Sequence, residues 1–227
     1  MRQAKAQKKR GPTDQGSRSA VTGGSQMDGF VDLIARIIRD AGIPEATIHR
    51  YKRLELPGYF RPTKKWDLLV VLDEALLAVI EVKSQVGPSF GNNFNNRTEE
   101  AIGSAVDLWT AYREGAFRLS PRPWLGYLFL LEDCPRSRSP VAVDEPHFQV
   151  FPEFHGASYM RRYELLCRKL VRERHYEAAA FLTAGAVGGK AGEFDEPAPD
   201  LTFAALVASL AGSMAAFAAA KKVSKNG

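Results

Sequence analysis

Three residues in the stretch "WDLLVVLDEALLAVIEVK" could together hold a metal ion and act on a phosphate. Glu81 and Lys83 lie two positions apart in an apolar run, so in a strand they would point to the same face. Asp67 opens the preceding apolar run, and a tight turn between the runs would place it near Glu81. Two converging carboxylates repel each other unless a hard cation such as Mg²⁺ lies between them. The pattern therefore predicts Asp67 and Glu81 as Mg²⁺ ligands, with Lys83 either orienting a metal-bound water or stabilising charge on a phosphodiester.

This three-residue pattern is loose, and a surface ion pair at the end of a strand would look the same. The apolar residues around Glu81 and Lys83 favour a buried pair instead, because they indicate a strand covered on both faces. A buried pair of charges is costly unless something neutralises or uses it.

The segment after Lys83 is predicted as a loop over residues 84–96. Asn side chains can pair with adenine edges, and Arg can pair with guanine edges or phosphate. The alternative is that these Asn residues only form turns, and that Asn96 caps the next helix with Glu99 three residues later. The residues predicted to contact DNA are Asn92, Asn93, Asn95, Asn96 and Arg97.

Other charged residues near the three-residue pattern could support it. Glu99 could bind a second metal ion or a metal-bound water, or it could simply favour the positive end of a helix. Arg61, Lys64 and Lys65 lie just before Asp67 and could hold phosphates regardless of base sequence.

The order of hydrophobic patterns indicates an α/β domain with a mixed central sheet flanked by helices. Two apolar runs form a predicted hairpin, and the stretch from 51 to 65, with two Pro and a Gly, reads as a loop. The predicted helices cover residues 27–41, 98–115 and 157–175, and the predicted strands cover 66–72, 76–82 and 124–133.

Charge and composition divide the 227-residue chain into four segments. The net charge of +5 lies in residues 1–26, which are predicted to be a basic flexible tail. Residues 27–184 form the predicted catalytic domain, and 185–199 form a Gly/Pro-rich link. Residues 200–227 are predicted to be an Ala-rich helix that packs on the domain or on a dimer partner. Its 20 uncharged residues, 201–220, leave a membrane span as the alternative.

The two cysteines lack metal-ligand spacing, and the basic N-terminus is not followed by an apolar run. A secretory signal is therefore not expected, and the predicted location is the cytoplasm.

Asp67, Glu81 and Lys83 match the motif of the PD-(D/E)xK nucleases. The longer run "EVKSQVGPSFGNNFNNRTEEAIGSAVDLWTAYREG", with "LPGYFRPTKKWDLLV" before it and "FHGASYMRRYELLCRKL" after it, resembles the XhoI-type restriction endonucleases. The resemblance spans about residues 23–175. Trp66 stands where the wider superfamily has Pro, and the XhoI-type sequences share this departure.

The resemblance implies a restriction-endonuclease-like fold and a Mg²⁺-dependent type II enzyme. Such an enzyme would be a homodimer that cuts double-stranded DNA at CTCGAG after the first C, leaving 5′-phosphates on 5′ overhangs. A matching DNA methyltransferase would protect the host. Two alternatives remain at this point: a repair or recombination nuclease directed by DNA structure, and a DNA-binding protein with an inactive nuclease core.

Overall fold

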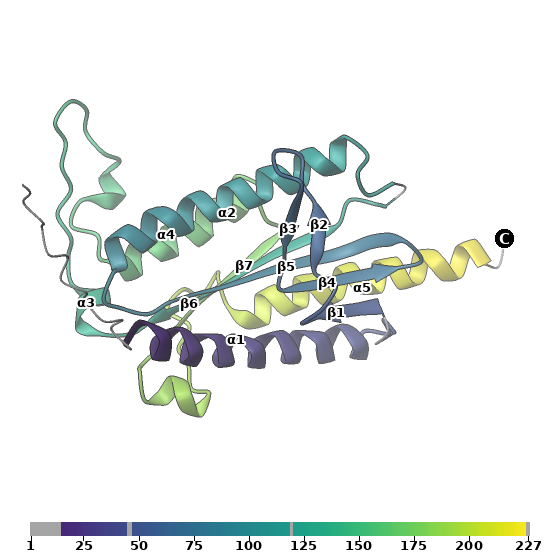
Figure 1. The fold of residues 1–227 in the computed structure, drawn as a ribbon, viewed down its shortest axis with the longest axis horizontal. Helices are drawn as coiled ribbons and strands as arrows, with labels where there is room; N and C mark the ends of the chain where they lie inside the picture. The colour runs from purple at the N-terminus through teal and green to yellow at the C-terminus, as the bar shows by residue number, and fades with distance from the viewer. Residues whose placement is uncertain (1–14, 45–46, 119, 226–227) are drawn as a thin grey trace, which may run out of the picture.

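A mixed sheet lies at the centre of the computed structural model, which describes residues 15–44, 47–118 and 120–225 (Figure 1). Its strand order within these residues is β1-β4-β5-β6-β7. Strands β1, β4 and β5 pair antiparallel, whereas β5, β6 and β7 pair parallel. The mixed α/β fold with flanking helices is therefore confirmed. The strands are β1 (Ile48–Arg50), β4 (Leu68–Leu72), β5 (Ala75–Gln85), β6 (Trp124–Glu132) and β7 (Ala178–Ala184).

The predicted hairpin is present as β4 and β5. Asp73 and Glu74 connect the strands with φ angles of 51° and 66°, the left-handed backbone that tight two-residue hairpin turns require. Leu68 pairs with Ile80, and the Asp67 N–H donates to the Ile80 carbonyl at 3.2 Å. This register places Asp67 beside Glu81, as the sequence predicted.

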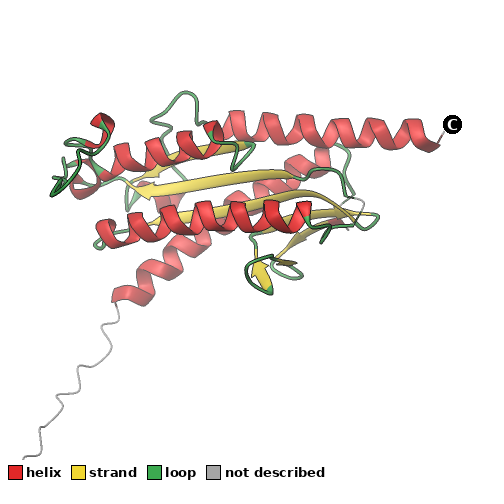
Figure 2. Cartoon of the chain, turned by 90° about the horizontal axis from the view of Figure 1, so that it is seen from above, coloured by secondary structure: helices red, strands yellow, loops and turns green. Residues whose placement is uncertain are grey.

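Helices cover both faces of the sheet, which explains why the central strands are apolar on both sides. Helices α2 (Phe90–Arg113) and α4 (Tyr159–Arg172) cover one face, and α1 (Gln15–Asp40) and α5 (Phe203–Lys225) cover the other (Figures 1 and 2). The shorter elements are α3 (Pro135–Arg138), η2 (Pro152–Phe154) and η3 (Gly188–Ala191).

The prediction of a loop over residues 84–96 was wrong. Strand β5 continues to Gln85, and α2 already begins at Phe90. Phe90 is buried and its ring stacks on Tyr159 of α4, with ring centroids 5.7 Å apart. This packing overrides the weak helix preference of the Asn residues that follow. Asn96 consequently lies inside the helix, and Ser89, not Asn96, occupies the N-cap position.

Two further boundaries differ from the sequence predictions. The first helix begins at Gln15 and not near Met27, so it includes part of the segment predicted as a flexible tail, while residues 1–14 lie outside the described residues. The stretch predicted as a loop contains a second, two-stranded sheet made by β2 (Glu55–Pro57) and β3 (Thr63–Lys65). Strands β1 and β7 were not predicted from the sequence.

The Ala-rich helix α5 packs on the sheet through one narrow stripe. Leu206, Leu210 and Met214 recur every four residues and are almost fully buried against α1 and the sheet. Within the described residues, α5 is the one helix long and apolar enough to span a membrane, and 17% of its apolar window, Phe203–Ala220, is buried. Most of its small residues therefore face away from the domain.

This packing makes a prediction about stability. Replacing Leu210 by Ala should lower the free energy of unfolding by about 2–4 kcal/mol, because a well-packed core closes only part of the resulting cavity. Leu33→Ala is the matched control, since Leu33 is 38% exposed on α1. Chemical denaturation of both variants measures the difference. Equal losses would show that α5 does not pack on the sheet as described.

Candidate active site

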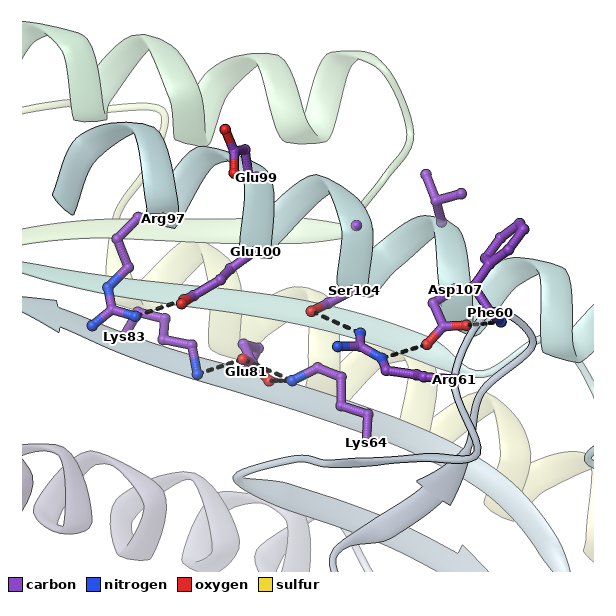
Figure 3. Close-up of a pocket in the computed structure, with 12 residues that line it drawn as sticks. Phe60, Arg61, Lys64, Glu81, Lys83, Arg97, Glu99, Glu100, Ser104 and Asp107 are labelled. Carbon is purple, nitrogen blue, oxygen red and sulfur yellow. Dashed lines mark hydrogen bonds and ion pairs between the residues drawn. The ribbon is translucent and has the colours of Figure 1, made fainter. Parts of the chain in front are cut away.

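Glu81 lies at the centre of the candidate site, on the middle strand β5, and is 2% exposed. The ammonium of Lys83 lies 2.5 Å from its Oε1, and the ammonium of Lys64 lies 2.9 Å from its Oε2. Strand alternation explains why Glu81 and Lys83 share a face, as the sequence predicted. Lys64 reaches the same carboxylate from β3, and Figure 3 shows both lysines converging on it. Two cations thus offset the cost of burying this carboxylate.

Asp67 supplies a second carboxylate next to Glu81. Its Oδ2 accepts the Val82 N–H at 2.7 Å, which fixes the side chain against β5. Burial, followed by the charge of Glu81, raises the pKa of Asp67 above its ordinary value. Such mutual repulsion is what a hard divalent cation between the two carboxylates would relieve.

The donor set of Asp67 and Glu81 fits Mg²⁺. Among the described residues, no group of three or more His, Cys, Asp or Glu could hold a metal ion. A pair of carboxylates suits Mg²⁺, which usually keeps several waters and takes phosphate oxygens as further ligands.

A pocket of about 650 Å³ opens beside these groups, between β5, the hairpin of β2 and β3, and α2 (Figure 3). It has room for a backbone phosphate and its neighbouring sugars. Its charged lining consists of Arg61, Lys64, Glu81, Lys83, Arg97, Glu99, Glu100 and Asp107.

The predicted phosphate-binding residues before Asp67 take different positions. Lys64 lines the pocket, and its ammonium also lies 4.2 Å from the ring centre of Trp66. Lys65 follows it in β3 and therefore points to the other face, outside the pocket lining. Arg61 lines the pocket while its Nε donates to Asp107 at 2.7 Å.

The predicted site residues on α2 also differ in whether they line the pocket. Arg97 lines the pocket and forms an ion pair with Glu100 at 2.6 Å, and Glu99 lines it as well. The pocket lining includes none of the four Asn residues, although Asn93 lies one turn before Arg97 and shares its side of the helix. Contact between DNA and these Asn residues stays a prediction.

Asp107 is a site residue that sequence reasoning missed. Its carboxylate accepts the backbone N–H groups of Tyr59 and Phe60 at 2.7 and 2.8 Å, in addition to Arg61. Burial alone would raise the pKa of Asp107, but the hydrogen bonds from Phe60, Arg61 and Tyr59 outweigh it and hold the pKa below its usual value. The available signal for Asp107 was its place on α2 among residues that are buried, where a carboxylate needs hydrogen-bond partners. Lys64 as a partner of Glu81 was also missed.

The raised pKa of Asp67 makes a prediction with a definite sign. Its carboxyl binds a proton more tightly in the folded than in the unfolded state, so ionised Asp67 destabilises the fold above its folded pKa. Asp67→Asn should therefore raise the thermal midpoint of the metal-free protein at neutral pH, with the gain shrinking as the pH falls through that pKa. Added Mg²⁺ should then stabilise the wild type more than the variant. Thermal unfolding in EDTA and in Mg²⁺ measures both effects.

Asp200→Asn provides a control of opposite sign. A two-pronged hydrogen bond from Arg168 lowers the pKa of Asp200 to about 2, so its carboxylate stabilises the fold above the unfolded pKa. That substitution should lower the thermal midpoint at neutral pH. A drop for Asp67→Asn as well would contradict the assignment of Asp67 as a repelled carboxylate.

Comparison with known proteins identifies the family of this chain. The family model for restriction endonuclease XhoI matches residues 6–196. The chain is 56% identical over 193 residues to the type II restriction enzyme BstVI of Geobacillus stearothermophilus, a match covering 83% of this chain and 86% of that protein.

Two further relatives are matched over shorter spans. The type II restriction enzyme XhoI of Xanthomonas vasicola is 56% identical over 158 residues, and AbrI of Azospirillum brasilense is 59% identical over 144 residues. These matches cover 69% and 63% of this chain, and each covers 64% of the relative. No solved structure matches the chain. The family model and the identity to BstVI show that this chain belongs to the XhoI restriction endonuclease family.

Proposed function

We propose that this protein is a type II restriction endonuclease that hydrolyses double-stranded DNA with Mg²⁺ as its cofactor. The observation that carries the proposal is the pairing of Glu81 and Lys83 in one pocket. Asp67 lies outside the pocket lining but is hydrogen-bonded to the β5 backbone at Val82, next to Glu81 in the chain. The family shown above supports the same reaction, because its relatives are type II restriction enzymes.

The residues of the pocket have distinct proposed roles. Asp67 and Glu81 hold the cation, which when bound polarises the phosphate and favours ionisation of a water. Lys83, held beside Glu81, stabilises the charge that grows on the phosphate as the bond breaks. Lys64 presents a second ammonium to the same phosphate. Arg61 and Arg97 contact neighbouring backbone phosphates, and their pairing with Asp107 and Glu100 fixes their orientation.

The proposed target is CTCGAG, cut after the first C to leave 5′-phosphates, and it rests on the family resemblance. A palindromic target suits a homodimer, because both have two-fold symmetry. The enzyme would act in the cytoplasm, where a DNA methyltransferase of the same specificity protects the host's own sites. The Asn residues at the start of α2, Glu99 as a water or second-metal ligand, and Lys65 as a phosphate contact remain parts of this proposal.

A digest tests the chemistry and the target together. The purified protein is incubated with a plasmid of known sequence carrying several CTCGAG sites, in Mg²⁺ and in EDTA, and the fragment ends are sequenced. Discrete Mg²⁺-dependent cuts after the first C of CTCGAG are expected. Discrete cuts elsewhere would overturn the target, and cuts at branched or nicked DNA alone would indicate a structure-directed nuclease. An intact plasmid in both Mg²⁺ and Mn²⁺ would indicate a DNA-binding protein.

Replacing Glu81 by Gln should separate cutting from binding. The substitution keeps the side-chain volume but removes the charge that Lys64, Lys83 and Mg²⁺ share, so cleavage should fall at least about 10³-fold. Sequence-specific binding in a gel-shift assay should persist, because base contacts and metal ligands are different residues. Glu177→Gln is the matched control, since Glu177 pairs with Arg122 on the surface, outside the pocket. Cutting by Glu81→Gln at the wild-type rate in Mg²⁺ would remove Glu81 from the site.

A further inference from the structure

The short hairpin of β2 and β3 presents two aromatic rings at its tip, residues 58–62. Tyr59 is 55% exposed and Phe60 is 69% exposed, and their rings meet edge to face with centroids 5.1 Å apart. Phe60 lines the pocket together with Lys83. Figure 2 shows the hairpin standing out from the body of the molecule. Exposed aromatic pairs are costly in water and commonly mark a contact surface.

This tip is held firmly although it is exposed. The buried carboxylate of Asp107 accepts both backbone N–H groups of the aromatic pair and the Nε of Arg61. Gly58 makes the approach to α2 possible, because a Cβ there would lie 2.5 Å from Asp107 Oδ2 and 2.7 Å from the Arg61 carbonyl oxygen. At the base of the hairpin, the Trp66 N–H bonds to the Leu54 carbonyl, and both side chains are buried. The rings are thus exposed on a fixed support.

The charge around the tip indicates the kind of partner. Residues 50–65 contain six Lys and Arg against a single acidic residue, Glu55, which favours a polyanion. Two other exposed aromatic residues, Phe148 and Phe151, lie in residues 139–153, which contain three acidic residues and no Lys or Arg. Although the Lys169 ammonium lies 5.4 Å from the ring centre of Phe151, it pairs with Glu153. Of the two stretches, the one that adjoins the candidate pocket therefore has the excess of basic residues.

We propose that Tyr59 and Phe60 contact the bases of the DNA duplex beside the cleaved phosphate, and that Asp107 is the positioning residue that holds them there. The inference rests on the proposed nuclease function, because the pocket at the foot of the hairpin then holds the phosphate. Apolar side chains on a rigid support can enter a groove and partly unstack a base step, or pack on the sugars. The hairpin thereby sets how the duplex lies across Glu81 and Lys83.

Phe60→Ala tests the contact without disturbing the core, because the ring is mostly exposed. Binding is measured with a short fluorescein-labelled duplex carrying CTCGAG, in Ca²⁺ in place of Mg²⁺ so that binding is followed without hydrolysis. The substitution should weaken binding by about tenfold, the size typical for losing an aromatic–base contact. Phe148→Ala, the matched control, should bind like the wild type, and both should keep the wild-type thermal midpoint.

Several outcomes would overturn the inference. Equal affinity of Phe60→Ala and Phe148→Ala, in a protein whose wild type cuts and binds the duplex, would remove the aromatic contact while leaving the nuclease intact. A change in sedimentation of Phe60→Ala with unchanged DNA affinity would make the tip a contact between subunits. Failure of the wild type both to cut and to bind the duplex would overturn the proposed function, and this inference with it.

A double-mutant cycle tests whether Asp107 acts through the tip. Asp107→Ala should weaken duplex binding by about tenfold in the wild type and by less in the Phe60→Ala background, since part of its effect passes through the Phe60 ring and the rest through Tyr59 and Arg61. It should raise KM by a larger factor than it lowers kcat, because Asp107 accepts hydrogen bonds from the tip and from Arg61, and not from Lys64 or Lys83. Equal effects in both backgrounds would mean that Asp107 only supports the fold.

Asp107→Asn tests the same role if Asp107→Ala fails to fold. Asn keeps an oxygen for the two backbone N–H groups that Oδ1 accepts, but it loses the acceptor for Arg61. It should therefore retain more duplex affinity than Asp107→Ala. Weaker binding by the Asn variant than by a folded Ala variant would contradict the positioning role.

Discussion

The buried charge of Glu81 is the constraint on which the arrangement of the site depends. A charged carboxylate that is 2% exposed on the central strand is costly to bury unless cations lie beside it. Lys83 approaches from the same strand and Lys64 from the separate hairpin of β2 and β3. The hairpin is thus tied to the catalytic strand by an ion pair, and a metal ion that binds Glu81 must share it with these two ammonium groups.

The sheet topology places Asp67 and Lys83 near this charge. Strand β5 pairs antiparallel with β4 and parallel with β6, so it is central and both its faces are covered. The tight turn at Asp73 and Glu74, together with a β-bulge between Val70 and Val71, sets the register that brings Asp67 beside Glu81. Burial, followed by repulsion from Glu81, raises the pKa of Asp67. The fold therefore tolerates an unfavourable pair of carboxylates at the place where a divalent cation would make that pair useful.

The helix α2 forms the opposite wall of the pocket, and its charges act mainly by holding other groups. Glu100 orients Arg97, whereas Asp107 fixes Arg61 and the backbone of Tyr59 and Phe60. Two carboxylates on one helix face thus set the positions of cations and rings on different elements. The pocket contains as many carboxylates as cations for this reason, although its proposed substrate is an anion.

The sequence by itself determined the central elements and the core of the site. The register that brings Asp67 beside Glu81 also needs a β-bulge between Val70 and Val71, which was not predicted. Continuous apolar runs, by contrast, identified β4, β5 and β6, and strand alternation placed Glu81 and Lys83 on one face. These features depend on local periodicity, which a sequence displays directly. The resemblance to the XhoI family rested on longer runs of residues, and the family comparison confirmed it.

Only the tertiary structure decided the rest. The Asn-rich segment became helix because Phe90 and Phe94 pack on α4, a contact between residues distant in sequence. The Ala-rich strand β7 forms because β6 supplies its hydrogen bonds, and its own residues have little preference for strands. Lys64 meets Glu81, and Asp107 meets the hairpin tip, across 17 and about 47 positions of the chain. Such pairings depend on how helices and hairpins pack against each other, so no local sequence pattern predicts them.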